Sequence, residues 1–239
     1  MTSFYENPAV IGSSSDCPRT EAAFGLALDV RAKRILDLGC GDGEGSARLA
    51  KITGANVVCA DVSELAVAKC RDRGLEAHHV VLGESPLPFD TASFDLVYMT
   101  EVLEHLVDPD KAVDEVVRVL NPGGYLILST PNLACLPNRF LVGLGIQPLF
   151  SEVSTTRVFG RRFSVLGQGS QPVGHLRLYT KLALTEFLHA HGFSSVRVRG
   201  AAYHAQGLLS AVERVIALAP SLAMILVVSA RVEPAGHVK

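Results

Sequence analysis

Residues 34–43 read Arg-Ile-Leu-Asp-Leu-Gly-Cys-Gly-Asp-Gly, an apolar run that breaks into alternating glycines. The run predicts a buried parallel strand, and the helix formers that follow predict a helix over 43–53. Gly39, Gly41 and Gly43 can adopt positive φ and leave main-chain N–H groups accessible to a ligand. A strand, a glycine turn and a helix in this order predict a backbone cradle for a nucleotide-sized ligand.

An acidic residue follows the next apolar run. Val57 to Ala60 ends at Asp61, about 20 positions after the glycine turn, where doubly wound folds bind ribose hydroxyls with a carboxylate. A carboxylate also repels a 2′-phosphate. A helix N-cap or a surface position is the alternative for Asp61, but its register with the turn favours the ribose. We expect an unphosphorylated ribonucleoside derivative, either a dinucleotide or S-adenosylmethionine.

Glu44 separates these two ligands. In a Gly-x-Gly-x-x-Gly dinucleotide fingerprint that starts at Gly39, the third glycine would stand at position 44, which is Glu44. The Tyr-x-x-x-Lys pair of short-chain dehydrogenases is also absent from the sequence. Asp-Leu-Gly-Cys-Gly-Asp-Gly (37–43) instead resembles motif I of class I S-adenosylmethionine-dependent methyltransferases.

Further segments resemble the same superfamily across most of residues 33–130 and 174–200. They are Leu87 to Phe89, Ser93 to Val97, Glu101 to His105, Leu120 to Thr130 and Gly174 to Thr180. Glu-x-x-Glu-His most resembles the ubiquinone-biosynthesis O-methyltransferase branch. The resemblance implies an α/β, Rossmann-like fold with a seven-stranded, mostly parallel sheet in the order 3-2-1-4-5-7-6 and helices on both faces. It also implies S-adenosylmethionine as methyl donor and S-adenosylhomocysteine as product.

The resemblance assigns cofactor contacts to motif residues. The glycines would hold the methionine portion, Asp37 its amino end and Asp61 the ribose. The expected cofactor-binding set is Asp37, Gly39, Cys40, Gly41, Asp61, Val62, Glu84 and Glu101. Many relatives carry Gly-Asp-Ala shortly before Leu-Pro-Phe, and that Asp holds the adenine amino group. Here Glu84 would replace it in a shifted register, or backbone groups would do so.

The expected catalytic residues are His105 and Glu104. His105 follows the predicted fourth strand, and its neutral form is available as a base near neutral pH. Glu101, Glu104 and His105 are spaced to share one face of a helical turn. That face could hold a divalent cation that clamps a diol, because the matching residues of the ubiquinone branch are associated with a metal. The favoured alternative has no metal, with Glu104 orienting His105.

The alternation of strands and helices stops between Pro131 and Gly174. An insertion of about 40 residues after strand five is long for a structureless connection, so we expect a lid over the cofactor crevice. It is apolar and carries Arg139, Arg157, Arg161 and Arg162. Such a lid suits a lipid-like or anionic acceptor and is compatible with peripheral membrane contact. The alternative is a solvated loop that packs on itself.

His175, Arg177 and Tyr179 alternate on a short segment where this insertion rejoins the core. In an extended chain alternate side chains face the same way, so the three are expected to bind the acceptor substrate. They could equally pin the lid to the core.

Composition limits the partners and the compartment. The formal net charge of −2 gives no electrostatic footprint for nucleic acid. Thr100 to Leu103 stands where enzymes that methylate nucleobase amino groups carry Asn/Asp-Pro-Pro-aromatic. Five cysteines without metal or disulfide spacing suit a reducing cytoplasm. No secretory signal is recognised, and Pro220 interrupts the most apolar stretch, so we expect no membrane span.

We therefore expect one methyltransferase domain over residues 1–239, with a lid over 131–174. Its predicted reaction is methyl transfer from S-adenosylmethionine to a small-molecule acceptor, most simply to a hydroxyl oxygen. Two alternatives remain open: an NAD-dependent oxidoreductase, and a catalytically silent cofactor-binding scaffold of the same fold.

Overall fold

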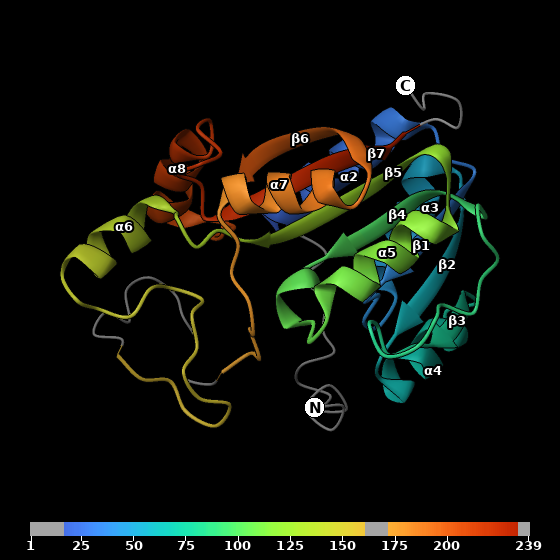
Figure 1. Ribbon diagram of the computed structural model, residues 1–239, viewed down its shortest axis with the longest axis horizontal. Helices are drawn as coiled ribbons and strands as arrows, with labels where there is room; N and C mark the ends of the chain where they lie inside the picture. Colours follow the sequence, from blue (N-terminus) through green and yellow to red (C-terminus); the bar gives the residue numbers. More distant parts are fainter. Residues whose placement is uncertain (1–16, 161–171, 234–239) are drawn as a thin grey trace.

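The computed structural model describes residues 17–160 and 172–233, which build one twisted sheet covered by helices on both faces (Figure 1). The sheet has seven strands in the order β3-β2-β1-β4-β5-β7-β6. All neighbours pair in parallel except β7, which runs antiparallel to both β5 and β6. The predicted order and fold class are confirmed. The strands are β1 (Arg34–Leu38), β2 (Asn56–Asp61), β3 (Glu76–His79), β4 (Phe94–Thr100), β5 (Leu120–Pro131), β6 (Phe193–Ala201) and β7 (Ile225–Val232).

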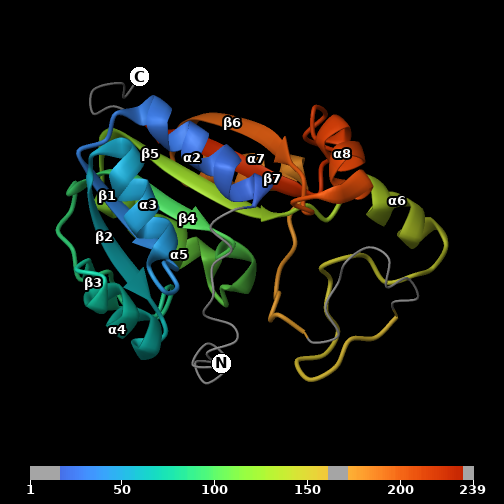
Figure 2. The same cartoon turned by 180° about the vertical axis from the view of Figure 1, so that it is seen from behind.

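Two helical layers cover the sheet, as the front and rear views show (Figures 1 and 2). One layer contains α2, α3 and α4, and the other contains α5 and α7. Helices α6 and α8 lie at the far end of the molecule from β3. The helices are α2 (Pro18–Val30), α3 (Glu44–Thr53), α4 (Glu64–Asp72), α5 (Pro109–Val119), α6 (Leu136–Gly143), α7 (Lys181–Ala190) and α8 (Gly207–Ile216), with a 3₁₀ turn η1 at Leu103–His105.

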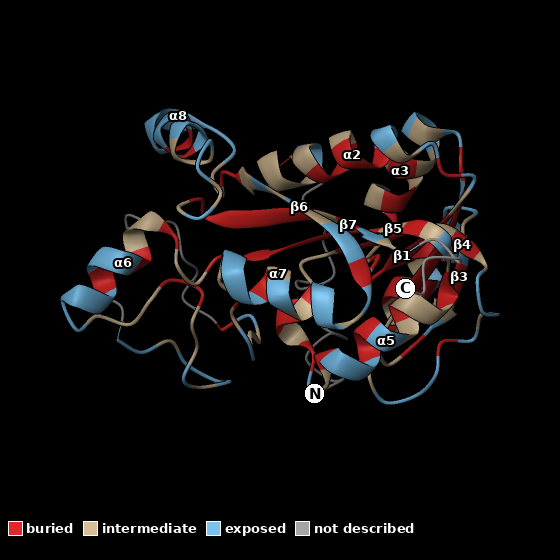
Figure 3. Ribbon diagram, turned by 45° about the horizontal axis from the view of Figure 1, so that its top comes forward, coloured by how far each residue is buried: buried red, intermediate tan, exposed pale blue. Residues whose placement is uncertain are grey.

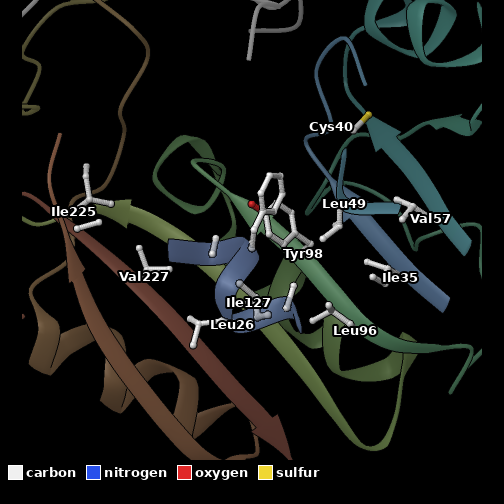
Figure 4. Close-up of a cluster of buried hydrophobic side chains, with 14 of the residues drawn as sticks. Leu26, Ile35, Cys40, Leu49, Val57, Leu96, Tyr98, Ile127, Ile225 and Val227 are labelled. Carbon is white, nitrogen blue, oxygen red and sulfur yellow. The ribbon is translucent and has the colours of Figure 1, made fainter. Parts of the chain in front are cut away.

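The apolar strand runs are explained by burial on both faces. Ile35, Leu96 and Ile127 pack against Leu26 of α2 on one face (Figure 4). The alternate residues along the same strands, such as Leu36, pack on the opposite face. Parallel strands that are covered on both sides read as continuous apolar runs rather than as alternating ones, which is the pattern of the opening segment.

Side-chain caps fix where several helices begin. The hydroxyl of Ser63 accepts a hydrogen bond from the N–H of Ala66 at 3.2 Å, and the carboxylate of Asp108 accepts one from Lys111 at 3.1 Å. Each cap satisfies an N–H group that has no partner inside its helix. Helices α4 and α5 therefore begin directly after the strand-end residues that form the candidate site.

Strand β3 is short and ends at His79. The N–H of the next residue, Val80, still donates to the carbonyl of Asp61 in β2 at 2.9 Å, and the chain near Leu87 bonds to side chains. The guanidinium of Arg118 donates to the carbonyls of Leu87 and Phe89, at 3.0 and 2.8 Å, and Glu115 accepts from the N–H of Leu87 at 2.7 Å. Pairing of β3 stops at His79 because its partner in β2 is Asp61, the last residue of that strand.

The insertion between strand five and the return helix has little regular structure in its described part. It contains α6 and an irregular chain up to Gly160, and Arg161 and Arg162 lie outside the described residues. Nothing in the described ranges forms a helix long and apolar enough to cross a membrane.

Candidate functional site

The glycine turn between β1 and α3 has the predicted conformation. Gly39, Gly41 and Gly43 have φ values of 77°, 58° and 79°. A Cβ at Gly39 would lie 2.3 Å from Cγ2 of Val102, and one at Gly43 would lie 2.8 Å from Sγ of Cys70. Both the backbone angles and the available space therefore require glycine at these positions. Because α3 begins at Glu44, the turn also presents the amino end of a helix to the space above it.

Asp61 meets the glycine turn at the carboxyl end of β2. One carboxylate oxygen accepts a hydrogen bond from the N–H of Gly41 at 2.9 Å, and the other accepts one from the N–H of Ser63 at 2.9 Å. The sequence register predicted this meeting. The carbonyl of the next residue, Val62, is bonded to Nε2 of His79 at 2.9 Å.

Asp37 lies beneath the turn. It is buried and accepts a hydrogen bond from the hydroxyl of Ser46 at 2.6 Å. Burial, together with the nearby Cys59, raises the pKa of Asp37 to about 8. Its contact with the amino end of a cofactor remains a prediction, because the hydrogen bond directs its carboxylate toward α3.

Three buried thiols gather beneath the same turn. The sulfur atoms of Cys40, Cys59 and Cys70 all lie within 4.8 Å of one another, with 3.5 Å between those of Cys40 and Cys70. Cys70 also approaches the carbonyl of Gly41, at 3.4 Å. The sequence showed no metal spacing because these cysteines come from a turn, a strand and a helix. Cys40 therefore supports the turn from below.

A second cluster forms at the carboxyl end of β4. Ligand atoms of Glu104, His105 and His175 lie within 4.8 Å of one another. The rejoining segment is fixed to η1 by backbone bonds, since the carbonyl of Glu104 accepts from the N–H groups of Leu176 and Arg177 at 2.8 and 3.0 Å. These bonds join residues that are far apart in the sequence.

The imidazole of His105 is held in one orientation. Its Nδ1 is bonded to the carbonyl of Gly174 at 3.0 Å, and because a carbonyl can only accept, Nδ1 carries the proton. The lone pair of the neutral ring is therefore on Nε2. Burial, assisted by the neighbouring His175, lowers the pKa of His105 to about 4. The ring is consequently neutral at physiological pH.

Glu104 is fully buried, and within the described residues neither carboxylate oxygen has a hydrogen-bond partner. Burial, and then the charge of Glu101, raise the pKa of Glu104 well above its usual range. Unpartnered buried carboxyls are uncommon in proteins, so this group points to a proton or a ligand that satisfies it.

The expected shared helical face of Glu101, Glu104 and His105 is wrong. The segment forms only the three-residue turn η1, and Glu101 precedes it with φ +57°, a value that is rare outside glycine. Glu101 accepts a hydrogen bond from Ser129 at 2.7 Å and forms an ion pair with Arg19 at 3.5 Å. Glu101 therefore lies between β4, β5 and α2. The cluster with Glu104 and His105 contains His175 instead of Glu101.

Of the three residues expected to bind the acceptor, the structure brings His175 to His105. Their ring centroids are 4.9 Å apart, and Nδ1 of His175 donates to the carbonyl of Phe150 at 2.8 Å. Arg177 donates to the carbonyl of Leu106, and Tyr179 is buried in the core. The alternative role, pinning the segment, therefore describes the contacts of Arg177 and Tyr179.

Two aromatic residues of this region were not predicted as site residues. The ring of Phe150 lies 6.4 Å from His175, and that of Tyr203 lies 5.3 Å from Phe150. They extend a row of rings from His105 toward α8. Their separation in sequence gives no periodic signal. Glu84, by contrast, is exposed in a turn after β3, and its adenine contact remains a prediction.

Residues 36–128 match a family model described as a methyltransferase domain. The chain is 44% identical over 108 residues to a demethylmenaquinone methyltransferase of Clavibacter sepedonicus, an alignment that covers 43% of this chain and 44% of the relative. It is 39% identical over 110 residues to a ubiquinone biosynthesis O-methyltransferase of Xanthomonas oryzae pv. oryzae, covering 44% and 46%. The chain thus spans less than half the length of these curated relatives.

Solved structures share the fold. An S-adenosylmethionine-dependent methyltransferase from Mesorhizobium loti superposes with a TM-score of 0.60 and 24% identity, covering 93% of this chain and 99% of that one. Another from Archaeoglobus fulgidus gives a TM-score of 0.59 at 17% identity, with 89% and 92% covered. The predicted superfamily and its cofactor, S-adenosylmethionine, are confirmed. Residues 36–128, which span the glycine turn, strands β1 to β4 and most of β5, are thus similar to the methyltransferase domain of class I S-adenosylmethionine-dependent methyltransferases.

Proposed function

We propose that the protein transfers a methyl group from S-adenosylmethionine to a hydroxyl oxygen of a small apolar molecule. The observation that carries this proposal is the neutral imidazole of His105, held at the carboxyl edge of the sheet that also holds the glycine turn and Asp61. A buried, oriented base at this edge suits removal of a hydroxyl proton. A silent scaffold has no need of such a base, and Glu44 in the place of the third fingerprint glycine disfavours a dinucleotide-dependent oxidoreductase.

The chain's own residues fit the cofactor. The N–H groups of Gly39 and Gly41 are already bonded, to the carbonyl of Ala60 at 2.8 Å and to Asp61 at 2.9 Å, so the glycines would serve the cofactor by letting it approach a backbone without Cβ atoms. Asp61 lies against the turn with both carboxylate oxygens at hydrogen-bonding positions. In this proposal Asp61 exchanges its bonds for ribose hydroxyls, and Glu101 and Val62 complete the wall of the pocket. When bound, S-adenosylmethionine supplies a methyl group that is already activated by its sulfonium.

His105 and its neighbours would prepare the acceptor. Nε2 of His105 takes the hydroxyl proton, while the bond from Nδ1 to Gly174 keeps the ring in place. The buried carboxyl of Glu104 makes no hydrogen bond to the ring of His105, so it would act on that ring through its charge or through a bound cation. His175 and Phe150 give the acceptor an aromatic wall, which excludes water from the reacting oxygen.

The acceptor is expected to be apolar and ring-bearing. The names of the two relatives refer to demethylmenaquinone and to ubiquinone biosynthesis, so they support a small-molecule class without identifying one compound. The aromatic row from His105 to Tyr203 suits the same chemistry. Residues 131–174 would act as the lid, and peripheral contact with a membrane would deliver an acceptor of this kind.

A divalent cation is a second candidate at the same place, favoured by the unpartnered carboxylate of Glu104. Glu104, His105 and His175 offer one oxygen and two nitrogens, a set that divalent transition metals accept. Both imidazoles donate from Nδ1, which leaves their Nε2 atoms suited to a metal. The sequence favoured a metal-free role. Turnover before and after exhaustive chelation, with Mg²⁺ or Zn²⁺ added back, separates the two candidates.

The proposal is tested in two steps with the full chain. Calorimetric titration with S-adenosylmethionine, S-adenosylhomocysteine and NAD should show micromolar binding of the two sulfur nucleosides only. Turnover of hydroxylated quinone analogues and simple phenols should then depend on His105, with His105→Asn slowing methyl transfer by about 100-fold or more. Binding of NAD alone would overturn the methyltransferase assignment. Unaltered turnover in His105→Asn would remove His105 as the base.

A further inference from the structure

Helix α8 presents its apolar side outward. The residues that it buries are Ser210 and Glu213, whereas Leu208, Val215 and the following Leu218 are 83%, 69% and 85% exposed. Figure 3 shows the outer surface of α8 as mostly exposed. A helix on the surface of a soluble protein normally has the opposite arrangement, because apolar residues gain free energy by leaving water. An apolar surface of this kind marks an interaction site.

The polar residues of α8 face inward because they have partners there. The carboxylate of Glu213 accepts hydrogen bonds from the N–H groups of Tyr203 and His204, both at 2.9 Å, and is bonded to the ring of His204 at 2.7 Å. These bonds fix the orientation of α8 about its own axis. The outward direction of Leu208, Val212, Val215 and Leu218 is therefore fixed by the fold.

Helix α6 lies at the same end of the molecule. The N–H of Leu136 donates to the carbonyl of Leu222 at 2.9 Å, and Arg139 donates to the carbonyl of Ser221 at 3.2 Å, so α6 is attached to the chain that follows α8 (Figures 1 and 2). Phe140 and Leu144 are exposed on α6 and just after it. Both helices at this end therefore carry exposed apolar side chains.

The charge of this end is positive. Between residues 132–160 and 202–222 the carboxylates are Glu152 and Glu213, against three arginines, Arg139, Arg157 and Arg214. The carboxylate of Glu213 is bonded to Tyr203 and His204. The carboxylate of Glu152 accepts hydrogen bonds from the N–H groups of Val173, Gly174 and His175. Apolar side chains flanked by cations are complementary to a surface that is apolar inside and anionic outside.

The apolar end is continuous with the candidate site. The ring of Tyr203, just before α8, contacts Phe150 at 5.3 Å, and Phe150 leads through His175 to His105. Helices α6 and α8 both follow strands that end at the edge of the sheet where the site lies. The row of rings therefore ends at the inner side of α8, the helix whose outer side is apolar.

We propose that the outer face of α8, defined by Leu208, Val212, Val215 and Leu218, docks on the surface of an anionic lipid bilayer. The four side chains enter the headgroup region, and Arg214 and Arg139 contact lipid phosphates. The route that this gives to an apolar acceptor rests on the proposed function, but the docking itself does not. The charge of this end favours anionic lipid over a second copy of the chain, which would bring like charges together.

The test is flotation of the full chain with vesicles, without cofactor or acceptor. Phosphatidylcholine vesicles are compared with vesicles that also contain phosphatidylglycerol. The test variant is Leu208→Gln/Val215→Gln/Leu218→Gln, and the matched control is Leu28→Gln/Leu182→Gln, which changes exposed apolar residues of α2 and α7. Because all five positions are exposed, both variants should fold, which thermal unfolding verifies.

We expect the wild-type chain and the control to bind the anionic vesicles, and the triple variant to lose binding by at least about tenfold. Arg214→Gln should weaken binding to anionic vesicles only. Equal flotation of the triple variant and the wild type would overturn the proposal, as would an absence of vesicle binding by the wild type. Dimerisation through this face, seen by light scattering and lost in the triple variant without any vesicle binding, would assign the surface to a second copy instead.

Discussion

The imidazole ring of His175 lies 4.9 Å from that of His105, although the two residues come from opposite sides of the insertion after β5. Each ring donates from Nδ1 to a backbone carbonyl, His105 to Gly174 and His175 to Phe150. Nδ1 therefore carries a proton in both rings, and the neutral ring of His105 has its lone pair on Nε2. The insertion thus completes the candidate site by returning a second imidazole to the end of β4.

Protonation of His105 should make the folded state sensitive to acid. Its folded pKa of about 4 lies below the usual value near 6.5, so the unfolded chain binds the proton first as the pH falls. This contribution to stability is present above about pH 6.5 and is lost toward pH 4, with a size of about 3 kcal/mol. Denaturant unfolding of the wild type and His105→Gln from pH 7 to 4.5 should show a steeper loss in the wild type. Parallel curves would contradict the burial of a neutral ring.

Replacement of Glu104 should have the opposite pH dependence. Burial and Glu101 raise its folded pKa, so the carboxyl favours folding while it is protonated and disfavours folding as the pH rises above its ordinary range near 4.5. In the presence of a chelator, Glu104→Gln should gain stability relative to the wild type between pH 4.5 and 8. A constant difference across that range would show that the carboxyl is not desolvated. Calorimetry of Zn²⁺ with both proteins tests the cation candidate separately.

Loss of the Asp61 carboxylate should weaken cofactor binding. An Asp61→Asn side chain no longer accepts hydrogen bonds with two charged oxygens, so the Kd for S-adenosylhomocysteine should rise by about tenfold or more. Asp72→Asn, at the exposed end of α4, is the matched control and should bind as the wild type does. Equal affinities of the two variants would remove Asp61 from the binding site. The measurement is isothermal titration calorimetry.

Gly39→Ala should destabilise the fold as well as the cofactor cradle. The alanine would have to adopt φ +77° and place its Cβ against Val102, at a cost of about 1–2 kcal/mol for the backbone alone. Gly25 lies within α2 and has open space at its Cβ position, so Gly25→Ala should instead stabilise by about 0.5–1 kcal/mol. Thermal unfolding of both variants measures the difference. Similar melting temperatures would contradict the observed turn conformation.

The strand order followed from the resemblance to the methyltransferase superfamily, whereas the residues themselves predicted the glycine turn and the meeting of Asp61 with it. These features depend on short-range patterns: apolar runs that are buried on both faces, glycines where φ is positive, and a fixed register between neighbouring parallel strands. The cap residues Ser63 and Asp108 likewise place helix starts through local hydrogen bonds. Local rules of this kind can be read along the chain because both partners lie within a few residues or on adjacent strands.

Only the tertiary structure decided which side chains share the candidate site. His175 and Phe150 reach His105 through an irregular insertion that has no periodic pattern, and Glu101 leaves the expected helical face because one residue adopts positive φ. The sequence likewise did not predict the cluster of three thiols beneath the turn or the outward apolar side of α8. The physical reason is the same in each case: long-range contacts fix where an irregular segment lies and how a helix is rotated, and local composition does not encode either.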